Sequence, residues 1–112
     1  MNLIVKQWIE ALESGEYKFG QDRLKLSDNT FCCLGVLCDL YAKSHPDEES
    51  WIDVPYDGIH FQEMKFSMPI KVINWAQCYF LDQDELVVIN DRTSTVDYSK
   101  QIEYIRDHYS NF

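Results

Sequence analysis

Residues 31–41 read FCCLGVLCDLY, the longest nearly uncharged apolar run in the chain. Such a run is apolar on every side and too short to span a bilayer, so it predicts a helix buried in the core of a soluble domain. We expect this helix to cover about residues 32–43 and to end before His45-Pro46, because the residue preceding a proline disfavours helical geometry. Gly35 costs a helix about 1 kcal/mol relative to alanine. Its presence indicates that another element approaches the helix backbone closely at this point.

The composition limits the kinds of protein that this chain represents. Its 112 residues, 46% of them hydrophobic and 14% aromatic, predict one folded domain and exclude disorder. The net charge of -9 opposes direct contact with nucleic acid or an anionic membrane. We therefore expect a partner protein with a basic surface, although the same charge also serves solubility alone. The oligomeric state stays open.

Cysteine and histidine usage gives no metal or disulfide pattern. The amino terminus has no export signal, which predicts a cytoplasmic protein with free thiols. The four cysteines form neither a CxxC pair nor a zinc spacing, and the three histidines are scattered. We expect no metal and no cofactor.

Helices are predicted on both sides of the central run. Residues 2–14 form an amphipathic pattern that stops at Gly15, and a second pattern opens at Pro69 and stops near Cys78. Residues 86–89 are a buried strand or a short helix, which periodicity cannot decide. A last helix covers about residues 96–109. It is capped by Thr95 or Asp97, and one apolar stripe contains Tyr98, Ile102, Ile105 and Tyr109.

Strand patterns are short and local. Residues 17–19 and 23–26 alternate apolar and basic side chains around a turn at residues 20–22, which predicts a half-buried hairpin. Residues 45–68 predict a long and mostly irregular loop, either pinned to the body or forming short strands. The expected fold class is α+β: a single compact domain in which three to four helices surround a buried central helix, with a small antiparallel hairpin or sheet.

The first candidate site is the acidic segment 47–57. Clustered carboxylates steer a basic partner, and Trp and Tyr are frequent energetic centres of interfaces. The proposed partner-binding residues are Asp47, Glu48, Glu49, Trp51, Asp53, Tyr56 and Asp57. The alternative is a loop that wraps the body with its aromatic side chains inside.

A second candidate site would bind a nucleotide-like small molecule through basic side chains. Its residues are Lys18, Arg23, Lys25, Asn90, Asp91 and Arg92. For Asn90 and Asp91 the simpler interpretation is an ordinary turn in which both side chains bond their own backbone. Cys32 and Cys33 lie near a helix amino end, where a thiol can be activated, but packing in the core is the favoured role for both.

Two sequence blocks carry a resemblance. Residues 8–17 match W-x-x-A-L-x-S-G-x-Y, and together with the block at 31–41 they resemble a family of small hypothetical proteins of bacteriophages and bacterial genomes. Looser similarity continues through Met68-Pro69, Trp75-Ala76 and Asn90-Asp91. The resemblance implies a phage accessory protein acting in the host cytoplasm and supplies no activity.

Three functional hypotheses follow from these patterns. The first is a non-catalytic protein that binds and inhibits a host defence or regulatory protein through its acidic surface. The second is a small-molecule binder that sequesters a nucleotide-derived immune signal. The third is a cysteine-dependent enzyme that uses Cys33.

Overall fold

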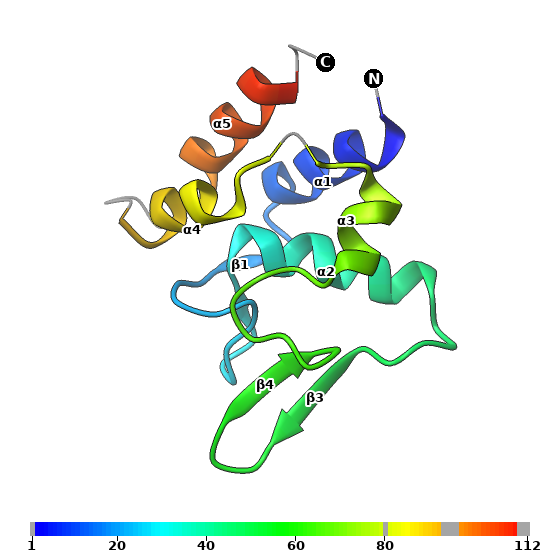
Figure 1. Ribbon diagram of the computed structural model, residues 1–112. Helices are drawn as coiled ribbons and strands as arrows, with labels where there is room; N and C mark the ends of the chain where they lie inside the picture. The colour runs from blue at the N-terminus through cyan, green and yellow to red at the C-terminus, as the bar shows by residue number, and fades with distance from the viewer. Residues whose placement is uncertain (1, 80, 93–96, 110–112) are drawn as a thin grey trace.

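The central apolar run folds as helix α2, Cys33–Ser44, which lies in the middle of the molecule (Figure 1). The computed structural model describes residues 2–79, 81–92 and 97–109. Of residue 109 it describes the backbone alone. Residues 33–38 and Tyr41 are all buried, as the unbroken apolar run predicts. Cys32 is the N-cap, and its Sγ accepts the backbone N–H of Gly35 at 3.4 Å. The helix ends before Pro46, also as predicted.

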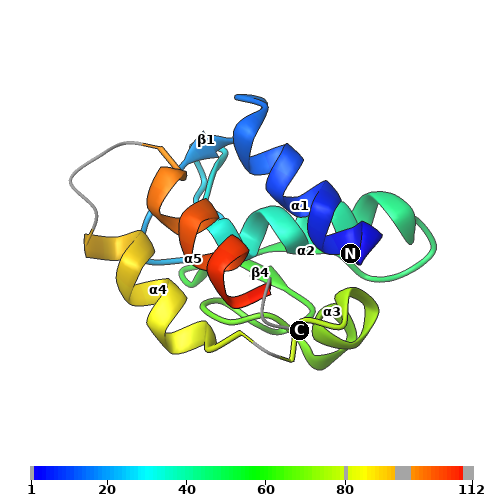
Figure 2. The same cartoon turned by 90° about the horizontal axis from the view of Figure 1, so that it is seen from above.

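In the described part of the chain, four helices surround α2, namely α1 (Leu3–Glu13), α3 (Ile70–Ala76), α4 (Gln83–Arg92) and α5 (Ser99–Tyr109). Helices α1, α3 and α4 pack directly against α2, and α5 packs against α1 and α4 (Figures 1 and 2). Trp8 of α1 is completely buried and donates its indole N–H to the carbonyl of Cys33 at 2.9 Å. This arrangement confirms the expected α+β fold with a buried central helix.

The amphipathic patterns at the chain ends are confirmed. Helix α1 buries one face, and Gly15 behind it has a φ of +80°, the left-handed conformation predicted for a helix stop. Asp97 caps α5 by accepting the backbone N–H of Ser99 at 3.1 Å. Tyr98, Ile102 and Ile105 are buried as predicted. Thr95 and the side chain of Tyr109 lie outside the described residues. The undecided residues 86–89 are helical and belong to α4.

The predicted hairpin of residues 17–19 and 23–26 is wrong. Strand β1, Lys18–Phe19, pairs in parallel with β2, Thr30–Phe31, and residues 20–29 form the loop between them. The backbone of Leu24 is engaged elsewhere. Its N–H donates to the carbonyl of Lys65 at 2.8 Å, and its carbonyl accepts the N–H of Cys32 at 3.2 Å. Leu26 likewise donates its N–H to the carbonyl of Thr30 at 2.9 Å, so residues 24–26 bond to Lys65 and to residues 30–32 instead of to residues 17–19.

Gly35 lies where the Leu24 loop crosses α2. A Cβ at position 35 would lie 1.8 Å from the carbonyl oxygen of Leu24, so any side chain would collide with backbone. The predicted close approach at Gly35 is therefore confirmed.

An antiparallel hairpin forms inside residues 45–68, where the sequence allowed short strands. It consists of β3, Trp51–Val54, and β4, Gly58–Phe61, paired from Trp51↔Phe61 to Val54↔Gly58. The hairpin extends away from the helices (Figure 1).

Candidate functional site

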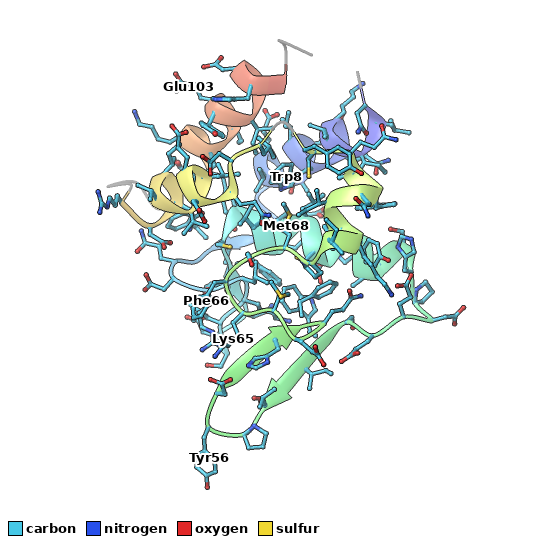
Figure 3. All side chains as sticks on the ribbon, in the orientation of Figure 1. Trp8, Tyr56, Lys65, Phe66, Met68 and Glu103 are labelled. Carbon is cyan, nitrogen blue, oxygen red and sulfur yellow. The ribbon has the colours of Figure 1, made fainter. Side chains whose placement is uncertain are left out.

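The tip of the β3–β4 hairpin presents one aromatic side chain to solvent. The N–H of Asp57 donates to the carbonyl of Val54 at 3.0 Å and closes the turn, while Tyr56 and Gly58 adopt φ values of 66° and 87°. Tyr56 is fully exposed and points away from the body (Figure 3). A hydrogen-bonded turn thus places this tyrosine at the tip of the hairpin.

The other aromatic of the acidic segment, Trp51, faces inward. Its ring packs edge-on against Phe31 and Phe61, with centroids 5.9 and 4.8 Å away, and its indole N–H donates to Asp39 Oδ1 at 2.9 Å. For Trp51 the structure thus gives the alternative arrangement, in which an aromatic side chain of this segment packs against the body, because its ring finds apolar partners at the base of the hairpin. Trp51 attaches the hairpin to the body, and Tyr56 is left as the exposed aromatic.

Two of the five predicted carboxylates are engaged within the chain. Glu48 accepts the Tyr41 hydroxyl at 2.9 Å and pairs with Lys71 at 3.4 Å. Asp57 contacts His60 Nε2 at 2.8 Å and Lys65 Nζ at 3.1 Å. These donors lower the pKa of each carboxyl, chiefly through the hydrogen bond from Tyr41 to Glu48 and from Lys65 to Asp57.

The other three carboxylates, Asp47, Glu49 and Asp53, are exposed. Within residues 2–79, 81–92 and 97–109, none of their side chains has an ion pair or a hydrogen bond. We call these three residues together with Tyr56 the acidic hairpin surface. It combines uncompensated negative charge with one projecting aromatic side chain.

The structure does not bring the six residues of the second candidate site together. Lys18 and Lys25 line an open groove beside β1 and β2. Arg23, Asn90 and Asp91 line a separate, very small cavity near the start of α2. Arg92 is exposed at the end of α4.

The groove beside β1 and β2 has a volume of about 260 Å³ and contains a connected polar cluster. Asp39 accepts the Tyr17 hydroxyl at 2.6 Å and the Trp51 indole N–H, and Lys43 Nζ lies 3.3 Å from its carboxylate. Burial acts to raise the pKa of Asp39, but the hydrogen bonds and the lysine charge outweigh it, so the pKa lies below its usual value. Burial and the hydrogen bond to Asp39 raise the pKa of Tyr17. The tyrosine is thus a neutral donor rather than a base.

A family model described as a domain of unknown function matches residues 1–111. The chain belongs to the DUF8296 family. This match covers both sequence blocks on which the resemblance rests, and it confirms membership of an uncharacterised family. No curated protein and no solved structure matches the chain.

In this DUF8296 domain, Asn90 connects three elements and is not a turn residue. It is 1% exposed in the last turns of α4. Its Oδ1 accepts the N–H of Cys33 and the side-chain amide of Gln101, both at 3.1 Å, and its Nδ2 donates to the carbonyl of Gly20 at 2.9 Å. The turn interpretation is wrong because residues 86–92 are helical. The four-residue spacing from Leu86 to Asn90, which puts both on one helical face, was the sequence signal for this role.

Asp91 supports the same junction. Its Oδ1 accepts the backbone N–H of Asp22 at 2.9 Å, and its carbonyl accepts the Gln21 side chain at 3.1 Å. Asn90 and Asp91 therefore position the loop between β1 and β2 against α4, and their side chains are occupied by protein partners.

The four cysteines of the DUF8296 domain are free and buried. Burial raises the pKa of Cys32 and of Cys78 to about 11, and it raises those of Cys33 and Cys38 as well. The amino end of α2 does not offset this burial. The thiols are protonated at neutral pH, which gives the cysteine-enzyme hypothesis no support from geometry.

The histidines are engaged in local contacts. The rings of His45 and His108 stack on Tyr41 and Tyr104 at 3.9 Å, and His60 binds Asp57. The described part of the chain contains no group of three or more His, Cys, Asp or Glu side chains able to hold a metal ion. None of its helices is long and apolar enough to cross a membrane.

Proposed function

We propose that this protein acts by binding a partner protein with a basic surface, and that the partner docks on the acidic hairpin surface. The observation that carries the proposal is the projecting hairpin, which has Tyr56 fully exposed at its tip and three carboxylates without counter-charges in the described chain. Clustered charge accelerates encounter with an oppositely charged surface, and a tyrosine supplies a large contact area at low entropic cost.

The attachment of the hairpin supports this proposal. Trp51 packs between Phe31 and Phe61 and bonds to Asp39, while Lys65 and His60 brace the turn through Asp57. A preorganised hairpin loses little conformational entropy on docking, so more of the contact energy appears as affinity. The packing of Trp51 and the contacts of Glu48 and Asp57 thus hold the hairpin in place, while the acidic hairpin surface stays exposed.

The proposal also includes the class of protein to which the partner belongs. The sequence resemblance supports a phage accessory role, in which the bound protein is a host defence or regulatory factor in the cytoplasm and binding inhibits it.

The test is capture from a bacterial lysate by wild type and two charge-matched variants. One is D47N/E49Q/D53N, and the other is E10Q/D84N/E103Q, which changes three exposed carboxylates on the helices. Glu103 lies at the other end of the molecule from Tyr56 (Figure 3). We expect a protein captured by wild type and by the helix variant to be lost with the hairpin variant. Equal recovery by all three proteins would exclude the acidic hairpin surface.

A further inference from the structure

Three lysines line the groove beside β1 and β2, in a chain whose net charge is -9. Lys18 belongs to β1, Lys25 to the loop that follows it, and Lys43 to the last turn of α2. Tyr17 and Asn29 add a hydroxyl and an amide to the same lining. The local excess of cations is the opposite of what the overall composition predicts.

Lys25 is held in place without an anionic partner. Its Nζ lies 5.2 Å from the ring centre of Phe31 and 5.4 Å from that of Trp51, so two aromatic faces stabilise the ammonium. No carboxylate lies within ion-pair distance of Lys25 or Lys18 among the residues that the structure describes. The N–H donors of Lys25 are therefore available to a ligand in the groove.

The acidic residues of the groove cancel only part of this charge. Asp39 is covered by Tyr17, Trp51 and Lys43, which satisfy its two oxygens. The second carboxylate, Glu16, is exposed. Because Asp39 and Lys43 neutralise each other, the charges of the groove that have no ion pair are the positive charges of Lys18 and Lys25 and the single negative charge of Glu16.

We propose that this groove binds a small phosphorylated metabolite. Lysine ammonium groups bind phosphate as point charges, and the amide of Asn29 can donate an additional hydrogen bond. A volume of about 260 Å³ approaches that of small-ligand sites. A nucleic acid would bring its polyanionic backbone against the acidic remainder of the chain, which favours a compact anion. Two residues of the predicted ligand set, Lys18 and Lys25, line this groove, and Lys43 joins them. The other four predicted residues lie outside the groove, namely Arg23, Asn90, Asp91 and Arg92. This proposal does not depend on the hairpin proposal.

The test uses inorganic pyrophosphate as the probe, titrated into ¹⁵N-labelled protein at low ionic strength, with sulfate as a reference anion. We expect saturable shifts at residues 17–18, 25, 29 and 43, with tighter binding for pyrophosphate than for sulfate. K18Q/K25Q should weaken pyrophosphate binding at least tenfold. K6Q/K100Q changes two exposed lysines outside the groove by the same charge and should leave binding within twofold.

Lys25 also contacts Phe31 and Trp51, so its replacement can disturb their packing. The variant K18E changes only the exposed Lys18 and leaves this packing intact. It should weaken pyrophosphate binding at least fivefold with an unchanged spectrum elsewhere. D47N/E49Q/D53N should still bind pyrophosphate, which separates this site from the hairpin. Absence of saturable binding, equal affinity for sulfate, or equal loss in K6Q/K100Q would overturn the proposal.

Discussion

Asn90 Oδ1 of α4 accepts the backbone N–H of Cys33, the first residue of α2, at 3.1 Å. The amino end of a helix has N–H groups without intrahelical partners, and a buried one needs an acceptor from elsewhere. Asn90 supplies this acceptor, and its own amide donates to the carbonyl of Gly20. One side chain thus fixes the start of the central helix against both α4 and the loop between β1 and β2.

Replacing Asn90 with alanine should destabilise the protein by about 2–4 kcal/mol, because it leaves a buried N–H and a buried carbonyl without partners. Chemical denaturation measures the change. The control is N74A, which removes only an exposed bond to Tyr79 and should cost less than about 0.5 kcal/mol. Similar small losses in both variants would contradict the role assigned to Asn90.

Gly35→Ala should destabilise by about 1–3 kcal/mol, although alanine is the better helix former. The added Cβ would lie 1.8 Å from the carbonyl oxygen of Leu24, so either the loop or the helix must move. Thermal unfolding of the variant tests this expectation. A melting temperature equal to or above that of wild type would show that the crossing at Gly35 is not tight.

The parts of the fold that the sequence predicted are those governed by local pattern. The apolar run at 31–41 indicated the buried helix, and the cost of Gly35 indicated the crossing. Residues 23–26 were predicted wrongly, because Leu24 bonds to Lys65 and Cys32, which local alternation cannot reveal.

The candidate sites depended even more on long-range packing. Trp51 turns inward because Phe31 and Asp39, both distant in sequence, lie beneath the hairpin. The groove residues Tyr17 and Lys43 are 26 positions apart and meet only because the residue before β1 lies against the last turn of α2. Exposed charge at Asp47, Glu49 and Asp53 was predictable, whereas the contacts of Glu48 and Asp57 were not.

The four thiols should resist alkylation in the native protein. Burial raises the pKa of Cys32 and Cys78 to about 11, so thiolate is scarce at pH 7 and access is limited. Iodoacetamide labelling followed by mass spectrometry should show slow modification in buffer and complete modification in denaturant. Fast labelling of Cys32 or Cys33 at pH 7 would instead restore the cysteine-enzyme hypothesis.

Asp39 should contribute stability that depends on pH. Its folded-state pKa is lowered, so its contribution is present at neutral pH and is lost as the pH falls through that value. The unfolding free energies of wild type and D39N should therefore differ most near pH 7, with wild type the more stable, and converge in acid. Urea titrations from pH 7 to pH 3 measure this difference. A constant difference across the range would show that the carboxylate charge does not matter.

Partner binding through the acidic hairpin surface is tested most directly by the affinity of a captured partner for wild type and for D47N/E49Q/D53N, measured at 50 and 300 mM NaCl. Attraction between exposed charges is screened by salt, so wild-type affinity should fall clearly between the two concentrations. The variant should bind at least tenfold more weakly at 50 mM NaCl and respond much less to salt. Equal affinities and equal salt dependence for the two proteins would contradict a function carried by the acidic hairpin surface.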